Sequence, residues 1–150
     1  MEAAKGSVVV GIDGSAESRA ALRWAGRYAA RLGRPLCAVA VWQDQLQFGP
    51  AAIFPEPEFE AEANRWLDRS LAELPPELAP VEVTTRVGRG DPVRVLVDVA
   101  RDAEVLVLGN HGRGALAGAL LGSVTLGCAH HARCPVVLVP RERAASGQPS

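Results

Sequence analysis

The sequence predicts an α/β fold in which a five-stranded parallel sheet, doubly wound, carries helices on both faces. Two observations lead to this prediction. Short apolar runs rich in valine, typical of strands buried on both faces, alternate along the chain with longer segments whose apolar residues recur at helical spacing. Residues that favour turns and helix caps separate the segments, and such β-α alternation is typical of parallel sheets. The 150 residues are expected to form one domain that ends in a flexible tail at 144–150.

Each element can be located along the chain. The strands are expected over residues 7–12, 35–42, 81–87, 104–108 and 134–140. The helices are expected over residues 15–32, 58–74, 91–101 and 123–132. The third strand alternates apolar with polar residues and is expected to lie half-exposed at a sheet edge, whereas the others are continuous apolar runs. Residues 43–57 are expected to form a loop over the sheet edge, and residues 88–90 a turn.

Cap residues indicate where the helices begin and end. Ser15 is a side-chain cap for the first helix, and Gly33 suits the left-handed residue that follows its last turn. Two prolines at 75–76 end the second helix. Asp91 followed by Pro92 is a strong helix start, so the third segment is expected to be helical although its many valines favour a strand.

A glycine-rich segment between the fourth strand and the fourth helix is the main candidate for a binding site. Glycines stand at 109, 112, 114, 118 and 122, directly before Ser123 and the expected helix. Glycine permits sharp turns and close approach, and the start of a helix leaves backbone N–H groups that attract an anion. The segment is therefore either a phosphate cradle made mostly of backbone or only a tight turn between strand and helix.

The spacing of these residues is more specific than their number. The pattern Gly109-x2-Gly112-x9-Gly122-Ser123, with His111 beside the second glycine, resembles the nucleotide-binding signature of the universal stress protein family, in its ATP-binding branch. The resemblance extends over a core of residues 5–141. It implies a Rossmann-like fold, similar to adenine nucleotide α-hydrolases, with strand order 3-2-1-4-5. It also implies a homodimer paired through the C-terminal strand at 135–139 and a regulatory role in the stress response.

The implied strand order also gives the position of the site. Ligands of doubly wound sheets bind beyond the carboxyl ends of the strands, where the order reverses, which here is between the first and fourth strands. The resemblance implies ATP as the ligand, with Mg²⁺ held through its phosphates and by no protein side chain. The implied nucleotide-binding residues are Gly11, Asp13, Val41, Leu108, Gly109, His111, Gly112, Arg113, Gly122, Ser123, Val124 and Thr125.

Side-chain chemistry suggests roles for some of these residues. An ionised Asp13 only accepts hydrogen bonds, which suits a ribose hydroxyl or the adenine amino group and not a phosphate. The hydroxyls of Ser123 and Thr125 can donate to phosphate oxygens alongside backbone N–H groups. Arg113 is a nearby cation, and His111 either touches phosphate or only caps the loop.

Other nucleotide and metal chemistries fit the sequence less well. A P-loop needs GxxxxGK[ST], and the chain has no lysine after Lys5. The GxGxxG of a dehydrogenase and the GxSxG of a serine hydrolase are absent. Cys128, His130, His131 and Cys134 lack standard zinc spacing, and a helix is expected to splay His130 away from Cys128 and His131.

No residue stands out as a general base, so we expect no catalytic residues and at most slow ATP hydrolysis. A net charge of −1 and the lack of a long apolar stretch argue against nucleic acid and membrane as partners. Three cysteines without framework spacing argue against a secreted module, so a cytoplasmic protein is expected. Two alternatives remain open: a nucleotide-free interaction protein of the same fold, and a binder of AMP or cyclic AMP.

Overall fold

The computed structural model describes residues 4–43, 56–112 and 121–141. The expected tail at 144–150 and most of the expected loop at 43–57 lie outside these residues. Within the described part of the chain, none of the helices has both the length and the apolar character needed to cross a bilayer.

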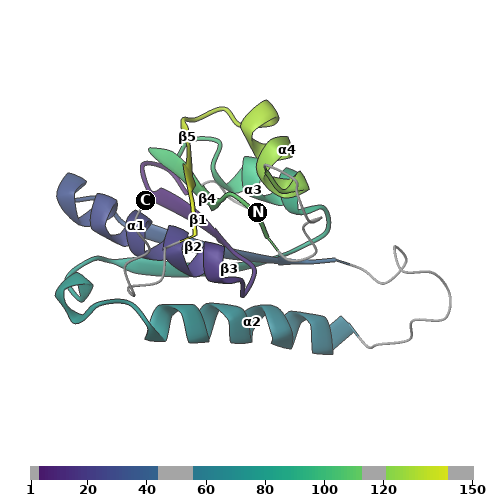
Figure 1. Ribbon diagram of the computed structural model, residues 1–150, viewed down its shortest axis with the longest axis horizontal. Coiled ribbons are helices and arrows are strands. Elements are labelled where there is room, and N and C mark those ends of the chain that lie inside the picture. The colour runs from purple at the N-terminus through teal and green to yellow at the C-terminus, as the bar shows by residue number, and fades with distance from the viewer. Residues whose placement is uncertain (1–3, 44–55, 113–120, 142–150) are drawn as a thin grey trace, which may run out of the picture.

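A five-stranded sheet forms the centre of the fold, in the order β3-β2-β1-β4-β5 (Figure 1). Its strands are β1 (Val8–Ile12), β2 (Leu36–Trp42), β3 (Val83–Arg89), β4 (Val105–Gly109) and β5 (Val136–Val139). Every neighbouring pair is parallel. Both the predicted fold class and the strand order implied by the resemblance are therefore confirmed.

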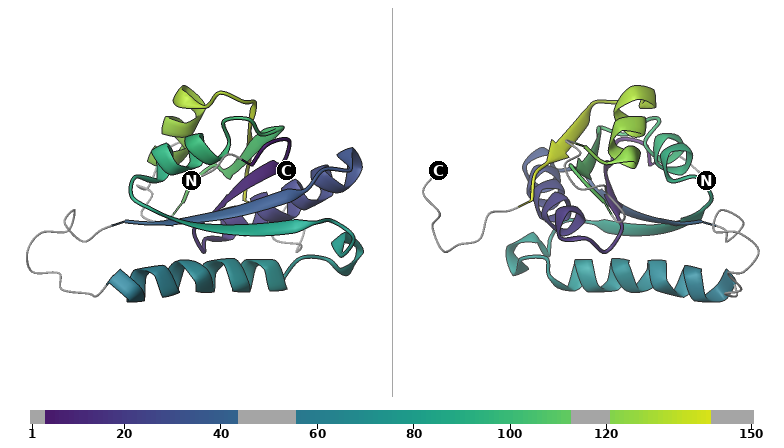
Figure 2. Two further views of the ribbon diagram at one scale, coloured as in Figure 1. Left: turned by 180° about the vertical axis from the view of Figure 1, so that it is seen from behind. Right: turned by 45° about the vertical axis from the view of Figure 1, so that its right-hand side comes forward.

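Helices cover both faces of the sheet. They are α1 (Ala16–Leu32), α2 (Glu56–Ala72), α3 (Pro92–Val99) and α4 (Ser123–His131), and a short 3-10 turn, η2 (Pro76–Leu78), follows α2. Figure 2 shows α1 and α2 on one side of the sheet and α3 and α4 on the other. Successive side chains of β1 point to opposite faces of the sheet. Val8 and Val10 pack in the core with α1 and α2, and Val9 packs in the core with α3 and α4.

The predicted caps account for where two helices begin and one ends. The Ser15 side chain accepts a hydrogen bond from the backbone N–H of Ser18, and Gly33 adopts the left-handed conformation after α1 with φ 64°. The Asp91 side chain likewise accepts from the backbone N–H of Val93 at 3.1 Å and starts α3. The cap therefore outweighs the strand preference of the valines in α3.

The predicted turn at residues 88–90 is wrong for two of its three residues. Gly88 and Arg89 belong to β3, where they pair with Val41 and Trp42 at the end of β2. The chain turns only at Gly90, whose φ is 119°. β3 extends this far because β2 is long and offers it a partner for each of its seven residues. The exposed side chains at the start of β3 confirm the predicted half-exposed edge strand.

Candidate functional site

A cavity of about 460 Å³ lies at the carboxyl ends of the central strands, where the strand order reverses. Its walls contain every predicted site residue that the structure describes. These are Gly11, Asp13, Val41, Leu108, Gly109, His111, Gly112, Gly122, Ser123, Val124 and Thr125. The remaining predicted residue, Arg113, lies outside the described residues. The volume is in the range of small-molecule sites.

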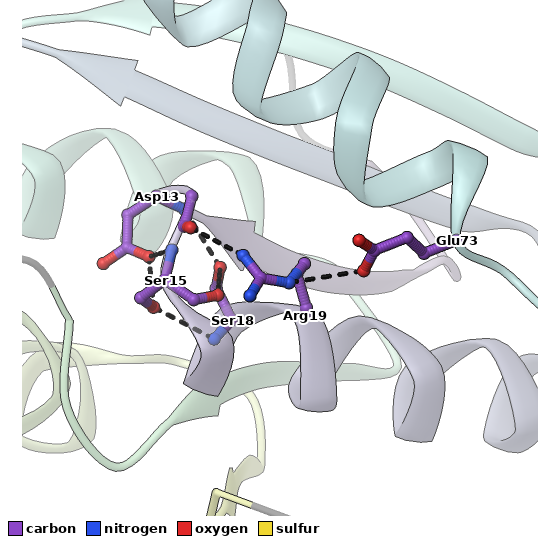
Figure 3. Close-up of polar contacts among 6 residues, drawn as sticks. Asp13, Ser15, Ser18, Arg19 and Glu73 are labelled. Atoms are coloured by element: carbon purple, nitrogen blue, oxygen red, sulfur yellow. Dashed lines mark hydrogen bonds and ion pairs between the residues drawn. The ribbon is translucent and has the colours of Figure 1, made fainter.

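The turn between β1 and α1 forms one wall, and its own side chains hold it in place (Figure 3). Asp13 Oδ1 accepts hydrogen bonds from the Ser15 backbone N–H, at 2.9 Å, and from the Ser15 hydroxyl. The Ser18 hydroxyl donates to the Ser15 carbonyl at 3.0 Å. These bonds orient the Asp13 carboxylate before any ligand arrives.

Arg19 ties this turn to the far end of α2. Its guanidinium donates to the Gly14 carbonyl at 2.8 Å, and its Nε lies 3.3 Å from Glu73 Oε2, just beyond α2 (Figure 3). Both side chains of the ion pair are partly exposed, so water screens its charge attraction. The pair links the turn to the residue that follows α2 and contributes little to stability.

The glycine-rich segment brings its two ends together at the cavity. The Gly122 N–H donates to the Asn110 carbonyl at 2.8 Å, and a Cβ at Gly122 would lie 3.4 Å from the backbone N of Gly112. A Cβ at Gly112 would overlap Asp13 Oδ2. A side chain at 112 would therefore displace the Asp13 carboxylate, whereas Gly122 packs at ordinary van der Waals distance where the start of α4 meets the end of β4.

Gly109 has a packing role as well as a place in the cavity wall. A Cβ at Gly109 would lie 2.7 Å from the Glu17 Cβ and 2.9 Å from its backbone carbon. The glycine thus lets the end of β4 pack directly against the first turn of α1. This contact requires glycine at 109 even in the absence of a ligand.

The role expected for the Thr125 hydroxyl does not match the geometry. Thr125 is 4% exposed, and its hydroxyl donates to the Gly109 carbonyl at 2.7 Å. A hydroxyl has one proton, so in this arrangement it cannot also donate to a phosphate. Thr125 instead ties α4 to β4, and Ser123 is the exposed hydroxyl at the start of the helix.

The start of α4 is suited to an anion. Its cap residue, Gly122, makes no side-chain cap hydrogen bond, and the first turn contains no acidic residue. The first backbone N–H groups of a helix have no partner within the helix, and the helix dipole places partial positive charge there. These groups at Ser123 and Val124 adjoin the cavity.

An apolar slot lies beside this polar end. Leu96 and Leu108 are each 4% exposed, and a Cβ at Gly11 would lie 2.8 Å from the Leu108 Cδ2 atom. Val41, at the end of β2, contributes a half-buried side chain to the same core. The cavity thus joins an apolar slot to a helix start rich in backbone donors, and a carboxylate lies in the same wall.

Comparison with known proteins shows the family. A model of the universal stress protein family matches residues 6–140. The chain belongs to the universal stress protein family. Universal stress protein Rv2005c of Mycobacterium tuberculosis is 34% identical over 148 residues, covering 95% of this chain and 50% of that protein. A universal stress protein of Mycolicibacterium smegmatis is 33% identical over 138 residues, covering 88% and 47%. The chain therefore spans about half the length of these curated relatives.

Solved structures of universal stress proteins share the fold. One, in complex with cAMP, is 32% identical with a TM-score of 0.63, covering 91% of this chain and 98% of that one. A family member from Burkholderia pseudomallei is 27% identical with a TM-score of 0.69, covering 90% and 96%. UspA of Lactobacillus plantarum, at 22% identity, shows the fold alone, with a TM-score of 0.71 and coverages of 92% and 99%.

In this universal stress protein, further residues line the cavity that the sequence analysis did not assign to a site. They come mainly from α2, α3 and the end of β2, and include Trp42, Phe59, Glu62, Trp66, Pro92 and Leu96. A signal for Phe59 was present, because a crossover helix begins near the carboxyl edge of a parallel sheet and an aromatic residue in its first turn lies close to the ligand site. Trp66 lies about two turns further along α2 and carries no such signal.

The cysteines and histidines near the end of α4 form a separate group. Cys128 is fully buried, and burial is the main cause that raises the pKa of its thiol to about 12, followed by the charges of Asp91 and Cys134. The rings of His130 and His131 meet edge to face with centroids 4.7 Å apart, so the expectation that the helix splays them apart is wrong. In the part of the chain that the structure describes, no His, Cys, Asp or Glu residues cluster as a candidate metal site.

Proposed function

We propose that this universal stress protein binds an adenine nucleotide, ATP in the first place, in the cavity at the carboxyl edge of the sheet. One observation carries the proposal. The described residues of the implied nucleotide-binding set, which are far apart in the sequence, line one cavity. We further propose that the chain acts as a single regulatory domain in a cytoplasmic stress response, a role carried over from the family.

The two ends of the cavity suit the two ends of a nucleotide. Phosphates would lie at the start of α4, where the backbone N–H groups of Ser123 and Val124 meet the glycine-rich segment. Mg²⁺ would be held by the phosphates. The base would enter the apolar slot beside Val41 and Leu108, and Asp13 would accept a hydrogen bond from the ribose or the base.

The arrangement supports binding more than catalysis. Two carboxylates of the described residues line the cavity. The proposal assigns Asp13 to the ribose or the base, and Glu62 on α2 pairs with Arg65 and accepts a hydrogen bond from Trp66. A base for phosphoryl transfer must be able to orient water against the terminal phosphate. We therefore propose a nucleotide-binding module with at most slow hydrolysis.

Cyclic AMP is a second candidate ligand. A universal stress protein 32% identical to this chain has been solved in complex with cAMP. AMP, cyclic AMP and ATP share the nucleoside and differ in phosphate charge and length. Comparing the three ligands therefore tests how much affinity comes from the start of α4.

We also propose that two copies pair through β5. This strand lies at the sheet edge, and it is a short, uncharged, half-buried run of apolar residues. An apolar edge strand invites pairing with another strand and is normally covered. A homodimer with antiparallel β5 strands would cover it.

The experiment that tests nucleotide binding is calorimetric titration of the wild type and Ser123→Glu with Mg-ATP, AMP and cyclic AMP. Ser123 is exposed at the first position of α4, where a carboxylate interacts favourably with the helix dipole and preserves the fold. The same carboxylate repels phosphate. We expect the variant to lose at least about tenfold in ATP affinity, equal to about 1.4 kcal/mol, with an unchanged melting temperature.

Ala129→Glu is the matched control, because it adds the same charge to an exposed position of α4 that is not part of the cavity wall. It should bind ATP as the wild type does. If the wild type binds none of the three nucleotides, the proposal fails, and the cavity belongs to a nucleotide-free interaction protein.

A further inference from the structure

The cavity crosses the carboxyl edge of the sheet and touches both of its faces. Val41 and Leu96 belong to the core beside α3 and α4, whereas Trp42 belongs to the core beside α1 and α2. All three side chains line the cavity. On the face covered by α1 and α2, residues of α2 form part of the cavity wall. These residues do not belong to the nucleotide-binding set that the resemblance to the family implies.

Three side chains make up this α2 wall: Phe59, Glu62 and Trp66. Their spacing of three and four residues places them on one face of the helix. On the adjoining strip of the same helix, Ala63 and Leu67 are 0% and 2% exposed and pack into the core. Phe59 and Trp66 are only partly buried, so their rings keep surface that faces the cavity.

Trp66 is held in a defined orientation. Its indole Nε1 donates to Glu62 Oε1 at 3.1 Å, and Arg65 donates to Glu62 Oε2 at 2.6 Å. The same part of the ring contacts the turn after β1, where a Cβ at Gly14 would lie 2.7 Å from the Trp66 Cδ1 atom and 3.0 Å from Nε1. Gly14 has φ 83°, so glycine is favoured there for its backbone as well as for its lack of a side chain.

This orientation decides which chemistry the wall can recognise. The indole N–H already has an acceptor, so the ring offers its aromatic surface to a ligand. The carboxylate of Glu62 lies in the same wall and disfavours phosphate there, although its pairing with Arg65 reduces the effect. Aromatic surface beside a carboxylate suits a purine or ribose, and Trp66 adjoins the turn that carries Asp13.

We propose that Trp66, together with Phe59, is a binding contact for the nucleoside part of the bound nucleotide. This inference rests on the proposed nucleotide binding. It assigns the aromatic wall of α2 to the base and ribose, and leaves the phosphates to the start of α4. Stacking of a base on an aromatic side chain contributes about 1–3 kcal/mol in nucleic-acid-binding proteins, which corresponds to about five- to 150-fold in affinity.

The test compares the wild type with Trp66→Leu and Trp66→Phe by calorimetric titration with ATP, AMP and adenosine. Trp66→Leu should lose about tenfold in affinity for all three ligands, because each contains the nucleoside. Trp66→Phe should recover most of this loss, since it keeps an aromatic ring although it lacks the indole N–H. Trp24→Leu is the control, because Trp24 stacks on Tyr28 at 4.9 Å in α1 and is not part of the cavity wall.

A second measurement reads the contact directly. The chain contains three tryptophans, so the signal of Trp66 is the difference between the wild type and Trp66→Phe, which leaves the cavity residue Trp42 in place. This difference in fluorescence should change when adenosine is added and should not change with inorganic triphosphate.

Two results would overturn the assignment: Trp66→Leu binding adenosine as tightly as the wild type, or a loss that appears only with ATP and grows with phosphate number. A wild type that binds none of these ligands would instead refute the proposed function, and the inference with it. The affinity of the wild type therefore separates the two failures.

Discussion

At the scale of single residues, two kinds of position build the site. Gly109 permits close packing of β4 against the first turn of α1, and Gly112 leaves room for the Asp13 carboxylate. Asp13 and Thr125 use hydrogen bonds to fix a turn and a helix start. Most of the candidate site is therefore organised by the chain itself before any ligand binds.

Thr125→Val tests the structural role of the threonine hydroxyl. The substitution keeps the shape of the side chain but removes the donor to the buried Gly109 carbonyl, which should lower the free energy of unfolding by about 1–3 kcal/mol. Chemical denaturation measures this change. Thr85→Val, at an exposed position of β3, should change stability far less. A variant with wild-type stability and strongly reduced ATP affinity would show that the hydroxyl serves the phosphate after all.

At the scale of elements, sequence patterns predicted the strands and helices because periodicity and caps are local properties. They failed at Gly88 and Arg89, which the composition of the segment suggested as a turn. Pairing with β2 determines that these two residues belong to β3, and the sequence of one segment carries no information about the length of the neighbouring strand. The same limit applies to Trp66 in α2, whose apolar spacing resembles that of the neighbouring core residues Ala63 and Leu67 and does not show that its ring lines a cavity.

A proline scan of β5 tests the proposed dimer. The carbonyls of Pro135 and Val139 accept from β4, so by alternation Val137 also faces β4 and the backbone N–H of Leu138 faces outward. Leu138→Pro removes an outward donor and should give a folded monomer in light scattering. Val137→Pro should instead break the ladder to β4 and destabilise the fold. A dimeric Leu138→Pro protein would rule out pairing through this edge.

At the scale of the whole molecule, the alternation of elements predicted the fold class, but the strand order came only from the resemblance to the family. The order is a property of the assembled sheet and leaves no mark on any one segment. It also determines the site, because it places the ends of β1 and β4 side by side. Walls contributed by α2 and α3 depend on how the helices pack over those ends.

The cavity extends across the carboxyl edge of the sheet and is lined by residues from both hydrophobic cores. A bound nucleotide would therefore contact both cores, which the sheet otherwise separates. Hydrogen–deuterium exchange can detect these contacts. Saturating ATP should slow amide exchange in α2 and in α3 together, although the two helices lie on opposite sides of the sheet (Figure 2). Ser123→Glu should need an at least about tenfold higher ATP concentration for the same slowing. Slowing confined to one side would mean that the ligand reaches only half of the cavity. Slowing on both sides would mean that one bound nucleotide stabilises the helix packing on both faces of the sheet.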